Sequence, residues 1–330
     1  MSKKLFIATA WNSTEFEAQS GQIRPKDMPV FDHPDILTLN AGDEAKHGNA
    51  RRFLGSGQLF HPANRGPFAE GEFTGKWQAG PYDDTAIDAV MLAWHARQAL
   101  KNPGPKWIVL DDEILLASAA GTNAQETCER RLVARNIAVD YARAQAPGVQ
   151  FGIYGPPQHC RDRETEYVRE YHVDAWFPEM YFKAKCWDKF WPAVDPHPYD
   201  LHSFETMWTN PGSQYENHTL RGMVDFWKCF RLGTGKPVYP TTWWCLDYYG
   251  PHAPYLGGRY GWDRKLVPVA IWKKLVTACF SELDGMCLWA GNRYYKTASA
   301  AAAGLTKVTF PSWNSVAIQA RWKPITARLG

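Results

Sequence analysis

The sequence has no run of hydrophobic residues that approaches the roughly 18 needed to cross a membrane. Its N-terminal apolar stretch, Leu5–Ala10, is too short for a convincing signal peptide. We therefore expect no membrane partner, and a protein that is cytoplasmic or released by a non-classical route. The chain also lacks an excess of charge, because 37 Lys and Arg residues oppose 34 Asp and Glu residues. That balance argues against a protein that binds nucleic acids.

Motifs for metals, phosphates and nucleophilic triads are also missing. None of the seven cysteines stands in a Cys-x-x-Cys or Cys/His arrangement with zinc-site spacing, so we expect neither a metal nor a cofactor. Cys279 and Cys287 lie in apolar runs, which favours buried reduced thiols, whereas Cys160 and Cys186 could pair at the rim of a barrel. The histidines suggest no triad, and no glycine-rich segment has the strand and helix context of a phosphate loop.

What the chain does have is an alternation of short apolar runs with amphipathic stretches, which is typical of a parallel sheet with crossover helices. The predicted strands are Leu5–Trp11, Asp35–Leu39, Trp107–Asp111, Val149–Tyr154, Asp174–Phe182, Pro237–Trp243 and Asp284–Ala290. An eighth could lie in the irregular stretch Gly42–Pro81. The length of 330 residues suits one α/β barrel. We therefore predict a single catalytic domain over 1–330, a TIM-like (β/α) barrel with seven or eight strands and long rim loops.

Helices are expected between these strands. Asp83 and Asp84 suit the N-terminus of the first, since acidic side chains stabilise that end of a helix. The main predicted helices are Asp83–Leu100, Glu126–Ala146, Leu220–Leu232, Asp263–Leu283 and Pro311–Trp322. In a barrel of this kind the active site lies at the carboxyl ends of the strands, so polar residues there are the first to consider.

The acidic segment Asp111-Asp112-Glu113 closes the most hydrophobic strand, Trp107–Asp111. Successive strand residues point to opposite sides, so Asp111 and Glu113 share one face and Asp112 takes the other. Two carboxyl groups on one face of a dry barrel mouth disfavour simultaneous ionisation, which leaves one protonated at neutral pH. A glycosidase needs such an acid to protonate the leaving oxygen. A helix cap with a solvated carboxylate pair is the alternative reading of the same residues.

Aromatic residues and one further carboxylate end several other strands. Glu179 and Tyr181 share a face, and Tyr181 could hydrogen-bond a reacting group of the substrate. Trp289 could form the floor of a sugar site, because aromatic faces stack on the C–H faces of sugar rings. Trp243 is adjacent to Trp244, so only one of the two can face inward, and Tyr154 ends another strand. Each of these aromatic residues could equally be a core residue.

The order of these strand ends resembles the hyaluronidase family of glycoside hydrolases. The resemblance is distant and runs over much of the chain. Chitinase-like barrels share its D-x-E motif, inward tyrosine and last-strand tryptophan. The segments that carry it are Trp11-Asn12, Asp111-x-Glu113, Phe151-Gly-Ile-Tyr154, Pro178-Glu-Met-Tyr181, Pro237-Val-Tyr-Pro-Thr-Thr-Trp243 and Asp284-Gly-Met-Cys-Leu-Trp289.

The resemblance implies substrate-assisted, retaining hydrolysis of a polysaccharide that contains N-acetylhexosamine. Glu113 would protonate the glycosidic oxygen, and Asp111 and Tyr181 would orient the substrate's acetamido group for attack on the anomeric carbon. Trp289 would pack against that group. We expect Trp243, Tyr154 and Asn12 to bind the substrate as well.

Two alternatives stay open. The family usually has an aromatic residue soon after the D-x-E motif, whereas Ile114-Leu115-Leu116 follow here. Glu179 is a second inward carboxylate, so it could act as the nucleophile of a double displacement with Glu113 as the acid. The other alternative is a carbohydrate-binding barrel without catalysis, although a lectin has no need of the paired acids Asp111 and Glu113.

Overall fold

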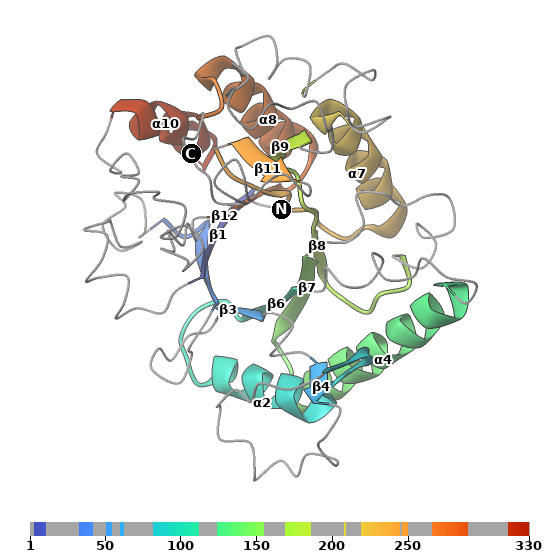
Figure 1. The fold of residues 1–330 in the computed structure, drawn as a ribbon. Helices are drawn as coiled ribbons and strands as arrows, with labels where there is room; N and C mark the ends of the chain where they lie inside the picture. The colour runs from blue at the N-terminus through green and yellow to red at the C-terminus, as the bar shows by residue number, and fades with distance from the viewer. Residues whose placement is uncertain are drawn as a thin grey trace, which may run out of the picture.

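The protein folds around a parallel sheet whose strands form a ring, with helices outside (Figure 1). The computed structural model describes residues 3–10, 33–41, 51–54, 60–62, 82–111, 124–154, 169–185, 208, 219–244, 246–249, 266–289 and 316–329. The sheet has eight strands: β1 (Lys4–Ala10), β2 (Ile36–Ala41), β3 (Arg51–Leu54), β6 (Trp107–Asp111), β7 (Gln150–Tyr154), β8 (Ala175–Phe177), β10 (Thr241–Thr242) and β12 (Gly285–Trp289).

The two ends of this sheet meet and close it into a barrel. Its order, β10-β12-β1-β2-β3-β6-β7-β8, follows the chain around the ring. Parallel bridges join Trp176 to Val238 and Glu179 to Thr241, which links β8 back to β10. The Tyr239 amide donates to the Trp176 carbonyl at 2.8 Å, and the Thr241 amide donates to the Pro178 carbonyl at 2.7 Å. The prediction of a TIM-like α/β barrel is therefore confirmed, with eight strands.

Side chains alternate between the inside of the barrel and the layer under the helices, as a pleated strand requires. Inside, four aromatic rings pack against one another with centroids 4.8 to 6.4 Å apart. These rings belong to Phe6, Trp107, Phe177 and Tyr239. Gly152 makes room for Phe177, because a Cβ on Gly152 would lie 2.4 Å from the ring's Cε2 atom. The barrel is thus a filled core, and a ligand would bind above it.

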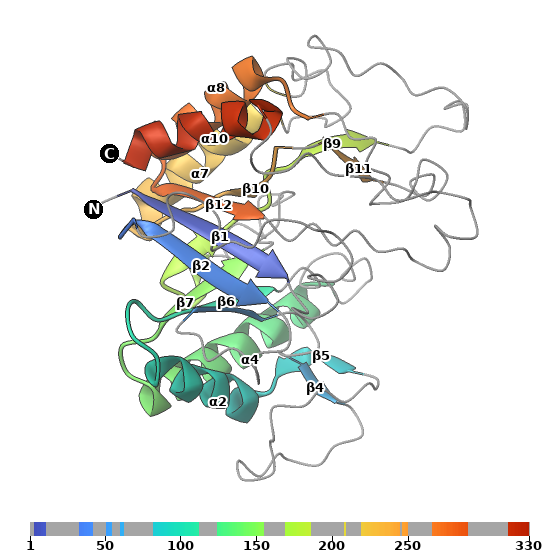
Figure 2. The ribbon, with the colours of Figure 1, turned by 90° about the vertical axis from the view of Figure 1, so that its left-hand side faces the viewer.

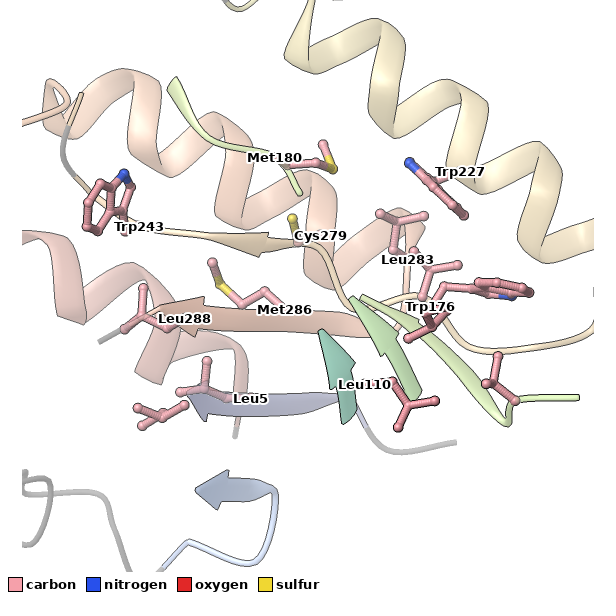
Figure 3. Close-up of a cluster of buried hydrophobic side chains, with 14 of the residues drawn as sticks. Leu5, Leu110, Trp176, Met180, Trp227, Trp243, Cys279, Leu283, Met286 and Leu288 are labelled. Carbon is pink, nitrogen blue, oxygen red and sulfur yellow. The ribbon is translucent and has the colours of Figure 1, made fainter. Parts of the chain in front are cut away.

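Within the described residues, five helices lie outside the other face of the strands: α2 (Ala89–Leu100), α4 (Ala124–Gln145), α7 (Leu220–Thr234), α8 (Val269–Glu282) and α10 (Val316–Leu329). Figure 3 shows part of this layer, where Met286 of β12 lies near Cys279 of α8. The Thr219 hydroxyl accepts from the Gly222 amide at the start of α7, and Gly235 ends that helix in a left-handed conformation, with φ of 69°. Cys279 and Cys287 are buried free thiols, as predicted.

Two small strand pairs lie beyond the barrel, at the end towards which the strand arrows point (Figure 2). One is an antiparallel pair, β4 (Phe60–Pro62) with β5 (Tyr82–Ile87), and the other is a parallel pair, β9 (Phe182–Lys185) with β11 (Leu246–Tyr249). The sequence predicted neither pair. Both chain termini in Figure 2 lie at the opposite end of the barrel.

Several predicted boundaries were wrong. Residues 82–87 form β5 instead of the start of a helix, and Asp88 caps α2 by accepting from the Val90 and Met91 amides. The strand predicted over Asp174–Phe182 ends at Phe177, because Pro178 has no amide hydrogen for the ladder. The eighth strand does lie in the irregular Gly42–Pro81 stretch, as β3.

Two further helix boundaries need correction. Leu266–Pro268 is not helical, so the last helix before β12 begins at Val269, later than the predicted Asp263. The C-terminal helix runs on past Trp322 and through Pro324 to Leu329. A hydrogen bond joins this helix to α8, in which the Trp272 indole donates to the Arg321 carbonyl at 2.8 Å.

Ion pairs join α7 to α8 at Glu282. Arg221 donates from Nη1 to Oε1 at 2.6 Å and from Nη2 to Oε2 at 2.8 Å, while Lys228 donates to Oε2 at 3.2 Å. The hydrogen bonds from Arg221 lower the pKa of Glu282 to about 2, from a usual value of 4.5. A depressed carboxyl pKa gives stability that is present above the usual pKa and is lost as pH falls towards the folded value.

Glu282→Gln should therefore reduce the acid sensitivity of the fold. We expect the free energy of unfolding to fall by about 1 kcal/mol at pH 7, since the pair is partly exposed, and by less at pH 3. Urea unfolding of wild type and variant at pH 7, 4.5 and 3 measures the difference, with the exposed Glu170→Gln as the control. A wild-type loss of stability between pH 4.5 and 3 that is undiminished in Glu282→Gln would contradict the assignment.

Candidate functional site

The carboxyl end of β6 brings an acidic side chain to the barrel mouth. Trp107 and Val109 of this strand lie in the interior cluster, while Ile108 and Leu110 lie in the layer under the helices. By the same alternation Asp111 faces the interior. It is half-buried, and one of its carboxylate oxygens is fully buried. Glu113, the predicted acid, lies outside the described residues.

The hydroxyl of Tyr154, the register partner of Asp111 on the next strand, meets the hydroxyl of Tyr181. Tyr154 ends β7 and pairs in register with Asp111 on one side and with Phe177 on the other. Its hydroxyl oxygen lies 3.2 Å from that of Tyr181, which is within hydrogen-bonding distance. Tyr154 is 5% exposed, whereas Tyr181 is half-buried. The structure thus brings together three of the predicted site residues, from β6, β7 and the segment after β8.

The adjacent tryptophans Trp243 and Trp244 take different partners. Trp243 packs against Tyr181, with ring centroids 5.6 Å apart and an angle of 51° between the rings. Trp244 packs edge-on against Trp272 of α8, at 6.2 Å. Trp243 is therefore the one that contacts Tyr181, although it belongs to the same helix-side cluster as Trp244 and is only 7% exposed, so it offers a ligand little of its surface.

Glu179 lies two residues after the end of β8, and Trp289 is the last residue of β12. Glu179 is half-buried, and its backbone bridges to Thr241 where β8 meets β10. Ala175 and Phe177 lie inside the barrel, and Met180 lies in the layer under the helices, so alternation directs Glu179 inward. The backbone of Trp289 pairs in register with Ala8.

The strand order places the backbone of Trp289 on the opposite side of the ring from Asp111. Its strand, β12, is four places around the eight-stranded ring from β6. The side chain of Trp289 is outside the described part of the chain, and so is the whole of Asn12.

Thr241 is a mouth residue that the sequence analysis did not single out. The alternation in Pro237–Trp243 puts Tyr239, Thr241 and Trp243 on one face, and this pattern could have pointed to it. Thr241 is buried, bridges to Glu179, and hydrogen-bonds through its side chain to Cys287. Burial raises the pKa of the Cys287 thiol to about 12, so this cysteine stays protonated and is no candidate nucleophile.

Within the ranges that the structure describes, no group of three or more His, Cys, Asp or Glu residues could hold a metal ion. In that same part of the chain, no helix has the length and hydrophobicity of a membrane span.

Comparisons with protein-family models and with curated proteins give no match. Among solved structures, the chain is similar to a thermostable mutant of a xylanase from Cellvibrio japonicus, at 10% sequence identity and a TM-score of 0.47. The match covers 100% of this chain and 98% of that chain. A likeness at this level of identity and TM-score carries no argument about the chemistry, which must come from the site itself.

Proposed function

We propose that the protein is a glycoside hydrolase that cleaves a polysaccharide containing N-acetylhexosamine, with Glu113 as the acid. The observation that carries the proposal is at the mouth of a closed eight-stranded barrel, where Asp111 ends β6 beside Tyr154, whose hydroxyl lies 3.2 Å from that of Tyr181. A carboxylate next to hydroxyl groups suits a polar, neutral ligand, and the strand ends are where barrel enzymes hold their catalytic groups.

Each group has a part in a retaining mechanism. Glu113 gives its proton to the glycosidic oxygen as the bond to the anomeric carbon breaks. The substrate's acetamido oxygen forms the new bond to that carbon, in place of a protein nucleophile. Asp111 accepts a hydrogen bond from the acetamido N–H, and Tyr181 donates one to the acetamido oxygen. Water then attacks the anomeric carbon and gives a proton to Glu113, while the bond from that carbon to the acetamido oxygen breaks and the acetamido group is restored.

The remaining residues bind the sugar chain or support those that do. Trp289 packs against the acetamido group from the opposite side of the mouth, and Asn12 binds the substrate after β1. Trp243 supports the ring of Tyr181, which it contacts at 5.6 Å. The polysaccharide substrate is the partner that binds at the barrel mouth, and the reaction needs no cofactor.

The test is a matched pair of substrates. An N-acetylated polymer should be hydrolysed, and the same polymer after de-N-acetylation should react at least about 100-fold more slowly, because it has lost its internal nucleophile. A thiazoline that mimics the cyclised N-acetyl intermediate should inhibit competitively. Equal rates on the two polymers would contradict substrate assistance.

Glu179 allows the rival mechanism to be tested in the same assay. It is half-buried, and alternation directs it inward. If catalysis is substrate-assisted, Glu179→Gln should lower kcat only partially, by about tenfold or less. A nucleophilic Glu179 would lie about 5–5.5 Å from the acid, and its loss would leave the enzyme nearly inactive. In that case azide would partly restore the activity of Glu179→Gly, and the thiazoline would have no effect.

A further inference from the structure

The junction between β8 and β10, where the barrel closes, is a seam at which one residue makes several contacts. β8 ends at Phe177, and the next residue, Pro178, has no amide hydrogen to continue the ladder. Thr241 of β10 nevertheless contacts this segment through three of its atoms. Its amide donates to the Pro178 carbonyl at 2.7 Å, its carbonyl accepts from the Met180 amide at 2.8 Å, and its hydroxyl donates to the Phe177 carbonyl at 3.5 Å.

These three contacts lie on both sides of Glu179. The two backbone bonds hold its neighbours, Pro178 and Met180, so the segment stays paired with β10 after the regular strand has ended. Tyr181, the proposed donor to the substrate, follows two residues after Glu179. The segment that presents both side chains at the mouth is therefore held by Thr241.

The hydroxyl is the part of Thr241 that depends on the residue type, because any residue except proline could supply the amide and the carbonyl. This hydroxyl is buried, and it also hydrogen-bonds with the Cys287 thiol of β12. A hydroxyl has one hydrogen to donate and two lone pairs, so it can donate to the Phe177 carbonyl and accept from the thiol at once. It thus links β8, β10 and β12 at the seam.

We propose that Thr241 is a positioning residue, whose hydroxyl fixes the segment after β8 and so keeps Glu179 and Tyr181 in place at the mouth. The effect on the rate rests on the proposed function, in which Tyr181 donates to the acetamido oxygen. Thr241 is 0% exposed and acts without touching the substrate. Because catalysis depends on the placement of the reacting groups, a looser segment should lower the rate even while the fold survives.

The next residue of the same strand provides a matched control. Thr242 is also 0% exposed, and its hydroxyl has no hydrogen-bond partner among the described residues. Replacing threonine by valine removes the hydroxyl and keeps the branched shape of the side chain. Thr242→Val should therefore leave the seam intact. It should also keep or raise the melting temperature, because an unpaired buried hydroxyl destabilises a fold.

The first test compares three variants on the N-acetylated polymer. Thr241→Val should lower kcat about three- to tenfold, as expected for the loss of one hydrogen bond, with KM changed less than about twofold. Thr241→Ser keeps the hydroxyl and should hold kcat within about twofold of wild type, and Thr242→Val should match wild type. A merely structural Thr241 would lower the melting temperature in Thr241→Val and leave the kcat of the folded enzyme unchanged. That result, or an equal fall of kcat in Thr242→Val, would overturn the inference.

Amide hydrogen exchange provides a readout that needs no substrate. The Met180 amide reports on the seam directly, because it donates to the Thr241 carbonyl. Its exchange should be about three- to tenfold faster in Thr241→Val than in wild type, and unchanged in Thr242→Val. The Leu92 amide, which donates to the Asp88 carbonyl at the start of α2, should exchange equally in all variants and so exclude a global loss of stability.

Exchange at Met180 also separates this inference from the proposed function. Faster exchange in Thr241→Val would uphold the hold of Thr241 on the segment even if no N-acetylated polymer were hydrolysed, in which case only the proposed function would fail. Met180 exchange that Thr241→Val leaves unchanged would overturn the inference whatever the enzyme hydrolyses.

Discussion

Replacing Glu113 by Gln is expected to lower turnover of the N-acetylated polymer by roughly 10²–10⁴-fold or more while the fold survives. Glutamine keeps the size of the side chain and its hydrogen-bonding capacity, but it has no proton to give to the leaving oxygen. The position follows from β6, whose residues Trp107, Val109 and Asp111 face the barrel interior in turn. The sequence predicts that this alternation continues past Asp111 to Glu113, which lies outside the described residues.

Asp112→Asn provides the matched control, because the sequence pattern predicts that Asp112 points away from the interior. This substitution also replaces an acid by its amide, as Glu113→Gln does, and the turnover of Asp112→Asn should stay within a few-fold of wild type. Steady-state rates, circular dichroism and thermal melting of both variants complete the measurement. A folded Glu113→Gln enzyme with near-normal activity would remove Glu113 as the acid and with it the proposed mechanism.

The barrel was predictable where a strand is apolar on both faces. Trp107–Asp111 is such a strand, and both its bounds and its inward acid at the mouth could be predicted from five letters of sequence. The short strand β3 could not be placed this way, because it contains two arginines in four residues. Arg52 is nevertheless 2% exposed.

What buries Arg52 is a partner that the local sequence does not reveal. Its Nη1 lies 2.9 Å from Nδ1 of His95 on α2, and its guanidinium lies over the ring of Trp94 at 5.8 Å. The partners are about forty residues further along the chain, so no periodicity within β3 encodes them. The same limit explains β5, whose residues pair with β4 across a long separation in sequence.

The candidate site, too, could be predicted only in part from the sequence. Strand ends could be listed from the sequence, and so could the residue types at them. Which of Trp243 and Trp244 contacts Tyr181 depends on the packing of α8, since Trp244 lies against Trp272. The pairing of the Tyr154 and Tyr181 hydroxyls joins residues 27 positions apart and depends on how β7 and β8 are aligned.

The largest effect on stability is expected at Gly285, where β12 begins beside β1. Gly285 has a φ of 132°, a region that residues with a side chain rarely adopt. A Cβ at this position would lie 1.9 Å from the carbonyl oxygen of Lys4, its register partner. A backbone atom cannot move aside as the end of a flexible side chain can. A shift of Lys4 would displace β1, the first strand of the barrel.

We therefore expect Gly285→Ala to lower the free energy of unfolding by about 4 kcal/mol or more, in the range reserved for severe backbone conflicts. The melting temperature should fall by roughly 8 °C or more, and soluble yield should fall with it. Two glycines of the α7 region serve as controls, because a Cβ on either Gly233 or Gly235 would meet no atom within 4 Å.

The two controls separate backbone strain from steric conflict. Gly235 has a φ of 69°, so Gly235→Ala should cost only about 1 kcal/mol of strain. Gly233 lies within α7, and Gly233→Ala should be neutral or stabilising by roughly 0.5–1 kcal/mol. If Gly285→Ala melts no lower than Gly235→Ala, then the close approach of β12 to Lys4 does not limit the barrel. If it melts far lower, the close packing of the start of β12 against Lys4 of β1 is what a side chain at 285 disrupts.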